Sequence, residues 1–172
     1  MRIAVTDACI FIDVIELRLT ARFFTLDIDI HTSSLVMDEV SREQKEILSE
    51  YISTGRLIVI AYTPDYHNEM MAISYPAALS LADKSVLLIA GKLNAIVLSS
   101  DKLVRNFAKN NSIDYHGLLW IIDKLLENGI LSPVEAIKKL QYLLDSNSYY
   151  RNRAELVTEI NKRIAILSAG IL

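Results

Sequence analysis

Short apolar segments alternate with amphipathic ones along the first two thirds of the chain. The apolar segments are rich in β-branched residues and have the length of buried strands. They are residues 2–6, 57–62 and 95–98, while residues 28–32 alternate like a strand and residues 113–115 could form a short fifth strand. Between them, apolar residues recur at helical spacing. This alternation predicts an α/β fold with a parallel sheet, covered by helices on both faces and joined by right-handed crossovers.

Four helices are expected between these strands. The first follows Asp7 directly, and the others span about residues 35–53, 80–93 and 102–110. Gly55 would end the second helix. The segment Ser80-Leu81-Ala82-Asp83 fits a capping box at the start of the third.

The last third of the chain has no further strand pattern. Beyond Gly117 the apolar spacing is helical, over about residues 118–128, 133–145 and 151–167. We therefore predict a sheet-containing domain at residues 1–130. Residues 131–172 would form a helical C-terminal extension, packed on that domain or on a partner.

Composition narrows the class of protein. Hydrophobic residues make up 52% of the 172 residues, which is enough for a full core and argues against disorder. The formal net charge is −3, so contact with nucleic acid would need a local basic patch or bound metal. The single cysteine, Cys9, excludes an internal disulfide. No segment approaches the roughly 20 apolar residues of a membrane helix. We expect a soluble, cytoplasmic protein with no membrane partner.

Acidic residues stand near the ends of two predicted strands. Asp7 ends the first, and Asp101 lies three residues beyond Leu98 at the end of the fourth. In open parallel sheets, ligands bind beyond the carboxyl ends of the strands. If the two strands are neighbours, both carboxylates meet there. Asp83 and Glu39, near the starts of their helices, could reach the same place.

A cluster of carboxylates without cations is unfavourable, because like charges raise one another's pKa. Mg²⁺ and Mn²⁺ remove this cost, since both prefer oxygen ligands. A bound ion also activates water and offsets charge on a phosphate in the transition state. The four acids are therefore candidate ligands of a metal site that acts on a polyanion.

Four segments resemble the successive acidic motifs of the PIN-domain family. They are V-T-D-A-C-I-F-I (5–12), T-S-S-L-V-M-D-E-V (32–40), L-S-L-A-D-K-S-V-L-L-I-A (79–90) and I-V-L-S-S-D (96–101). The segment from Ile113 to Pro133 resembles a branch of the family that is often paired with a small antitoxin. The resemblance covers about residues 1–145.

The resemblance implies a PIN-like, three-layer α/β/α sandwich with a sheet of four or five strands. It implies a Mg²⁺- or Mn²⁺-dependent endoribonuclease whose catalytic metal ligands are Asp7, Glu39, Asp83 and Asp101. Ser99 would be an orienting residue that hydrogen-bonds the first of these acids. RNA would be the substrate. The resemblance further implies a homodimer and the toxin of a toxin–antitoxin pair, with an antitoxin protein as partner.

Three positions depart from the family pattern. Ala8 and Cys9 follow the first acid where many members carry Ser, Thr or Asn, and Leu103 stands where many carry a polar or acidic residue. These departures indicate that a second metal ion would be held weakly. With the acidic net charge, they favour an alternative function: a catalytically weak or inactive PIN-like module that binds RNA or protein.

Each candidate acid also has a structural explanation. Asp7 and Asp101 precede helices and fit N-caps, and Asp83 fits the capping box. Glu39 fits a solvated helix face. That face would be shared with Glu43, Glu46 and Glu50.

Other charged residues lie near the acids in the sequence. Lys84, Lys102 and Arg105 flank them and are either phosphate contacts or ordinary solvated charges. Asp13 and Asp123 lie within predicted helices. We expect these two carboxylates to face solvent or a basic neighbour.

Overall fold

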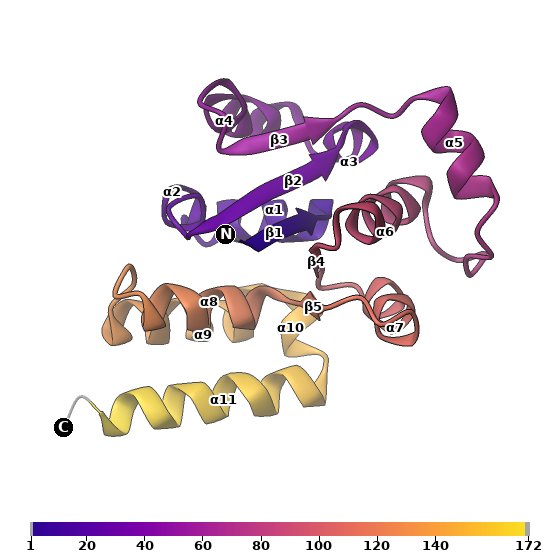
Figure 1. Cartoon of the computed structure of the whole chain (residues 1–172). Helices are drawn as coiled ribbons and strands as arrows, with labels where there is room; N and C mark the ends of the chain where they lie inside the picture. Colours follow the sequence, from indigo (N-terminus) through magenta and orange to yellow (C-terminus); the bar gives the residue numbers. More distant parts are fainter. Residues whose placement is uncertain (1, 171–172) are drawn as a thin grey trace. The chain divides into compact units, whose positions relative to one another are not determined.

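The computed structural model describes residues 2–170 (Figure 1). The chain forms two compact units, Met1–Leu118 and Leu119–Leu172. The first unit contains a sheet and its helices, and the second is helical. Among the described residues, no helix is long and apolar enough to cross a bilayer.

Five parallel strands form the sheet of the first unit. They are β1 (Arg2–Thr6), β2 (Ile28–Ser33), β3 (Leu57–Ile60), β4 (Ile96–Leu98) and β5 (Tyr115–His116). Their order is β3-β2-β1-β4-β5, so β1 is central. Ala4 of β1 lies opposite Ile30 on one side and Ile96 on the other. The strands β2 and β3 are added on one side of β1, and β4 and β5 on the other. The order therefore reverses between β1 and β4, and this is the topological switch point of the sheet. The predicted parallel α/β sheet is confirmed.

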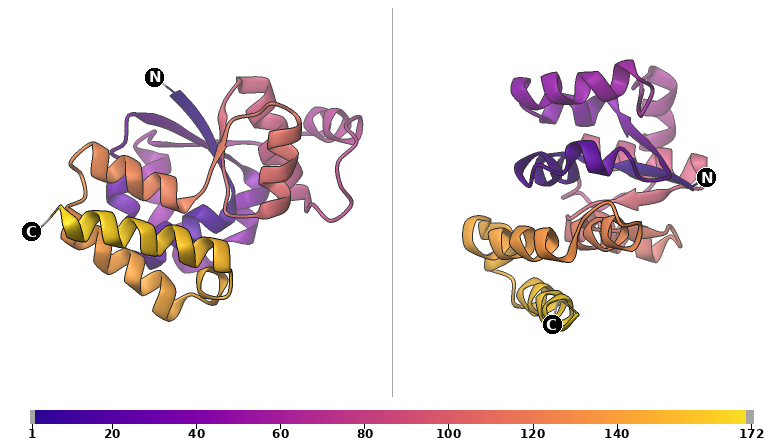
Figure 2. Two further views of the ribbon diagram at one scale, coloured as in Figure 1. Left: turned by 90° about the horizontal axis from the view of Figure 1, so that it is seen from below. Right: turned by 90° about the vertical axis from the view of Figure 1, so that its left-hand side faces the viewer.

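Helices cover both faces of this sheet (Figures 1 and 2). They are α1 (Ala8–Glu16), α2 (Thr20–Phe23), α3 (Ser34–Glu39), α4 (Arg42–Ser53), α5 (Pro64–Met71), α6 (Leu81–Leu93) and α7 (Lys102–Asn110). The six consecutive residues 85–90 of α6 are buried, and this helix contacts β1, β2 and β4. Phe11 of α1 is also fully buried. Apolar packing therefore holds α1 and α6 against the sheet.

The single helix predicted over residues 35–53 is wrong, because the chain breaks at Val40. Val40 is extended (φ −84°, ψ 149°), and Ser41 begins α4 as its N-cap. The Gln44 amide donates to the Ser41 hydroxyl at 3.3 Å, and the Ser41 amide donates to the Gln44 side chain at 2.8 Å. This capping box makes a new helix start more favourable than continuation. Glu39 therefore ends α3 and does not share a helix face with the acids of α4.

Asn94 ends α6 in the left-handed region (φ 49°, ψ 46°). An L-residue with a Cβ is strained there, whereas Gly is not. We expect Asn94→Ala to lower the free energy of unfolding by about 1 kcal/mol. Asn94→Gly should match or exceed the wild type in urea unfolding. Equal stability of the Ala and Gly variants would contradict this explanation of the cap.

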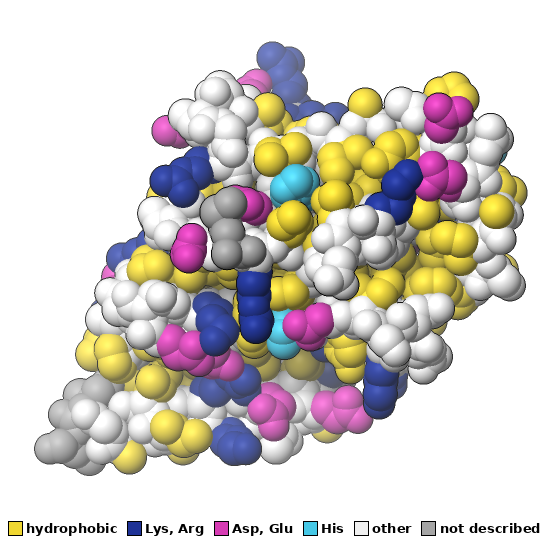
Figure 3. Space-filling view, viewed as in Figure 1, with side chains coloured by type: hydrophobic (Ala, Val, Ile, Leu, Met, Phe, Trp, Pro, Cys, Tyr) yellow, Lys and Arg dark blue, Asp and Glu magenta, His cyan; other side chains and the backbone are white. Residues whose placement is uncertain are grey.

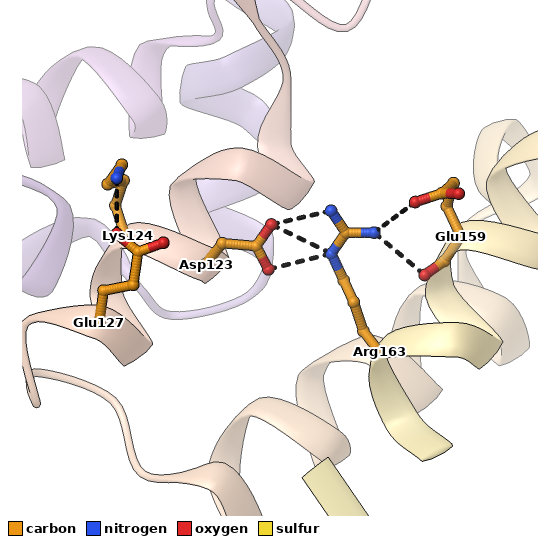
Figure 4. A network of polar contacts seen from close by, with 5 residues as sticks. All are labelled: Asp123, Lys124, Glu127, Glu159 and Arg163. Atoms are coloured by element: carbon orange, nitrogen blue, oxygen red, sulfur yellow. Dashed lines mark hydrogen bonds and ion pairs between the residues drawn. The ribbon is translucent and has the colours of Figure 1, made fainter. Parts of the chain in front are cut away.

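The second unit consists of helices α8 to α11. Their bounds are Leu118–Glu127, Pro133–Ser146, Ser148–Arg151 and Ala154–Ala169, with the first residue of α8 counted in the first unit. The last helix α11 packs along α9 (Figure 2). Arg163 of α11 donates to both carboxylate oxygens of Asp123 in α8 and to Glu159 one turn earlier (Figure 4). The basic neighbour predicted for Asp123 is confirmed.

Candidate metal centre

Asp7 lies at the carboxyl end of the central strand, where β1 passes into α1. Its backbone N–H donates to the Leu98 carbonyl of β4 at 3.2 Å, which continues the β1–β4 pairing. Its side chain is the N-cap of α1: Oδ1 accepts from the Ile10 amide at 3.2 Å and from the Cys9 thiol at 2.8 Å. The sequence folds this way because an acid directly before an apolar helix satisfies its first free amides.

Asp7 is only 4% exposed. Burial raises its pKa to about 6, although hydrogen bonds from Cys9, Ser99 and the Ile10 amide oppose the shift. The negative charge of Asp83 raises it further. Among residues 2–170, no Lys or Arg forms an ion pair with Asp7. A buried acid with several donors and no cation favours binding of an external positive charge.

Asp83 and Glu39 meet across the hydroxyl of Ser80. Ser80 is the N-cap of α6, and its Oγ lies 2.8 Å from Asp83 Oδ2 and 3.5 Å from Glu39 Oε1. Burial and then the charge of Asp83 raise the pKa of Glu39, against a hydrogen bond from Ser80. The two carboxylates therefore repel each other.

A buried hydroxyl pair joins the two helices that carry these acids. Ser33 Oγ, at the start of α3, lies 2.6 Å from Ser85 Oγ in α6. Both serines are almost fully buried. This contact fixes α3 against α6 and so keeps Glu39 beside Asp83.

Asp101 is exposed and caps α7. Its Oδ1 accepts from the amides of Leu103 at 2.6 Å and Val104 at 3.4 Å. Its own amide donates to Ser99 Oγ at 3.0 Å, and Ser99 also hydrogen-bonds Asp7. Asp83 thus interacts electrostatically with both Asp7 and Glu39, whereas Asp101 is connected to Asp7 through Ser99.

The donor atoms suit a hard divalent cation, but they are not gathered around one point. Capping occupies Oδ2 of Asp83 and Oδ1 of Asp101, and the other oxygen of each accepts no hydrogen bond from the described residues. Carboxylate oxygens are the ligands that Mg²⁺ and Mn²⁺ prefer. Within residues 2–170, however, no three His, Cys, Asp or Glu side chains lie close enough together to hold a metal ion.

Asp13 is buried, so the prediction that it faces solvent is wrong. It is 7% exposed in α1, and the Ser100 hydroxyl donates to its Oδ2 at 3.2 Å. Its carboxylate therefore contacts a hydroxyl at the end of β4 and is largely shielded from solvent. A buried acid next to the candidate centre is a feature that sequence reasoning missed. Its signal was a charge inside the apolar run I-F-I-D-V-I.

Comparison with known families shows which protein family this chain belongs to. The family model described as PIN domain matches residues 3–165. The chain belongs to the PIN-domain family. PIN domains are commonly nucleases that use divalent metals. The match confirms the resemblance inferred from the acidic motifs.

Two solved structures are similar to this chain. A PilT N-terminus domain protein from the hyperthermophile Sulfolobus solfataricus P2 is 18% identical, with a TM-score of 0.52 over 73% of this chain and 94% of that one. A domain of a functionally unknown protein from Methanocaldococcus jannaschii DSM 2661 is 22% identical, with a TM-score of 0.48 over 69% of this PIN domain protein and 91% of that chain. The first likeness supports the fold. No functionally curated protein matches the chain.

Proposed function

We propose that this PIN domain protein is a Mg²⁺- or Mn²⁺-dependent endoribonuclease. The observation that carries the proposal is Asp7: a buried carboxyl without a cationic partner, at the switch point of the sheet, with a pKa raised to about 6. Such a group is unfavourable in the protein alone and becomes favourable beside a cation. The proposal also rests on membership of a family of nucleases.

Asp7, Glu39, Asp83 and Asp101 are the side chains that would hold the ion. A bound divalent ion supplies positive charge for the phosphate and a more acidic water. Asp83 and Asp101 can offer their second oxygens without giving up the helix caps that use the first. The cap geometry and the ligand role are therefore compatible.

The surrounding hydrogen bonds orient these acids. Cys9 and the Ile10 amide hold Asp7, and Ser80 holds Asp83. Ser99 lies between Asp7 and the Asp101 amide, so it would set the spacing of these two ligands. Partners of this kind fix the direction of metal ligands and tune their affinity.

A second candidate is a PIN-like module that binds RNA or protein without cutting it. It is favoured by the separation of the acids, because within the described part of the chain no three of them lie close enough together to hold a metal ion. Leu103, an apolar side chain 42% exposed beside Asp101, also favours it. This module would bind no divalent metal tightly.

Calorimetric titration of Mn²⁺ into chelator-stripped protein separates the two candidates. The comparison is with the Asp7→Asn/Asp101→Asn double variant. Saturable binding that the double variant loses, together with Mn²⁺-dependent cleavage of single-stranded RNA, supports the nuclease. Full cleavage by the double variant would refute the assigned site. Absence of metal binding and of cleavage, with a stable RNA or protein complex, supports the second candidate.

Ser80→Ala tests the support of Asp83, and Ser41→Ala is its matched control. Both serines begin a helix with a capping box, but only Ser80 contacts candidate ligands. Each variant should lose about 1 kcal/mol of unfolding free energy, because a cap is removed. Only Ser80→Ala should also weaken Mn²⁺ binding, by about 10-fold. Equal metal affinity in the two variants would exclude the supporting role.

We further propose that the protein is cytoplasmic, forms homodimers and acts as the toxin of a toxin–antitoxin pair. The location rests on the single cysteine, which fits a reducing compartment. The dimer and the toxin role rest on the family resemblance, which for the toxin role includes the segment from Ile113 to Pro133. Induced expression of the wild type should then arrest growth, while Asp7→Asn should not. Light scattering on the purified protein measures the dimer. Unimpaired growth at equal protein levels would argue against toxicity.

A further inference from the structure

Arg105 has a buried donor without an acceptor. It lies in α7, where its amide donates to the Asp101 carbonyl at 3.1 Å. Its Nε is inaccessible to solvent and has no hydrogen-bond partner among the described residues. No carboxylate in that part of the chain forms an ion pair with it either. Arg163, by contrast, is paired with two acids.

The guanidinium of Arg105 lies at the carboxyl ends of β4 and β5. A Cβ placed on Gly117, directly after β5, would be 3.8 Å from Arg105 Nη1 and 3.5 Å from the Ser99 carbonyl oxygen. The Ser99 amide donates to the His116 carbonyl at 2.9 Å, so these residues lie side by side. Ser99 also contacts Asp7 and the Asp101 amide. Arg105 is therefore next to the candidate metal centre, on its β5 side.

An oxyanion is the group that this position lacks. Arginine remains charged at any physiological pH and offers donors only. A buried N–H without an acceptor destabilises the protein, whereas a phosphate accepts from the planar fork with two oxygens. On the face in Figure 3, basic side chains are interspersed with acidic ones. With a net charge of −3, phosphate contact therefore depends on individual cations such as this one.

We propose that Arg105 binds a backbone phosphate of single-stranded RNA beside the acidic centre. This inference deepens the proposed nuclease function and rests on it for the identity of the ligand. The cation offsets the repulsion between the phosphates and the carboxylates of the site. Arg105 thereby sets the path of the RNA from the β5 side of the sheet toward Asp7.

RNA binding without cleavage tests this role. Every protein carries Asp7→Asn, and the probe is fluorescein-labelled oligouridine measured by fluorescence anisotropy. Arg105→Met keeps the apolar stem and should raise the Kd about 10-fold. It should also reduce the slope of log Kd against log salt by about 0.7, the value for one phosphate contact on a single strand. Arg105→Lys should keep the slope but bind more weakly.

Lys109→Met is the matched control, because it removes an exposed positive charge from the last turn of the same helix. It should change neither the Kd nor the slope appreciably. Thermal unfolding of each variant shows whether the fold is retained. Equal Kd values and slopes for Arg105→Met and Lys109→Met would overturn the proposal.

Inorganic phosphate separates this inference from the nuclease proposal. At constant ionic strength, phosphate in place of chloride should raise the Tm of the wild type and leave that of Arg105→Met unchanged. A phosphate-induced rise in Tm that depends on Arg105, without metal-dependent cleavage, would uphold the anion site and refute the nuclease. Binding of neither phosphate nor RNA by the wild type would refute the anion site itself.

Discussion

Asp7→Asn is expected to abolish metal-dependent RNA cleavage and, at the same time, to make the metal-free protein more stable at neutral pH and above. The pKa of Asp7 is raised from 3.8 to about 6 by burial. The folded state therefore binds the proton of Asp7 more tightly than the unfolded chain does. This contribution to the free energy of unfolding is fully present below pH 3.8 and is lost as the pH rises through about 6. At about pH 8 the ionised group costs up to about 3 kcal/mol, because a tenfold change in a protonation equilibrium corresponds to about 1.4 kcal/mol.

Asparagine keeps the shape of the side chain and an oxygen for the Ile10 amide, but it carries no charge. Urea unfolding in the presence of a chelator should show wild-type stability falling between about pH 4 and pH 7. The variant should lack that fall and be the more stable protein at the upper end. Cleavage should drop by more than about 100-fold, because Asp7 is a proposed direct ligand and the loss of a ligand matters more than the loss of its supporting residues.

Asp27→Asn is a suitable control for both measurements, since Asp27 is an exposed acid of the same unit. It should leave cleavage and the pH profile unchanged. A loss of stability in Asp7→Asn at about pH 8 would show that the carboxylate is stabilising in the metal-free protein. The ionised Asp7 would then need no external cation to be stable in the folded protein.

Arg163→Met is expected to destabilise the helical unit by about 2 kcal/mol. Arg163 is the only donor that the described residues provide to the Asp123 carboxylate, and its side chain is 23% exposed. Removing the guanidinium leaves Asp123, itself 31% exposed, as a partly buried carboxylate without its cation. The partial exposure of both groups keeps the expected loss below that of a fully buried pair.

The double variant Asp123→Asn/Arg163→Met distinguishes charge pairing from packing. It removes both charges and should recover part of the stability, because no unpaired carboxylate remains. Glu159→Gln, at the exposed end of the network, should have a smaller effect than either. The readout is chemical unfolding followed by far-UV circular dichroism. Additive losses in the double variant would show that the pair has no coupling energy.

The sheet could be predicted because its strands are short, either mostly apolar or alternating in polarity, and separated by helices. The neighbouring position of β1 and β4, on which the meeting of Asp7 and Asp101 depended, is present in the structure. The break at Val40 was missed because the helical spacing of apolar residues continues across it. The local signal was Ser41 with Gln44 three residues later, and local capping outweighed the periodic pattern.

The direction of the acidic side chains could not be read from the sequence. An N-cap and a metal ligand would both stand at the end of β4, so the sequence position of Asp101 fits either role. The hydrogen bonds from the first amides of α7 show that Oδ1 points toward the helix. The burial of Asp13 depends on Ser100, which is far away in the chain. The burial of Arg105 Nε without a hydrogen-bond acceptor among the described residues likewise depends on residues that are distant in the sequence.

The thiol of Cys9 gives the protein a built-in reporter. It donates to Asp7 and accepts from the Ser100 amide at 3.1 Å, and burial together with the charge of Asp7 raises its pKa. Alkylating reagents attack the thiolate, so the folded protein should react slowly and the unfolded chain quickly. Because the chain has no other cysteine, the labelling rate follows a single position. It would measure how often the junction of β1 and α1 opens, directly beside Asp7 and without any engineered probe.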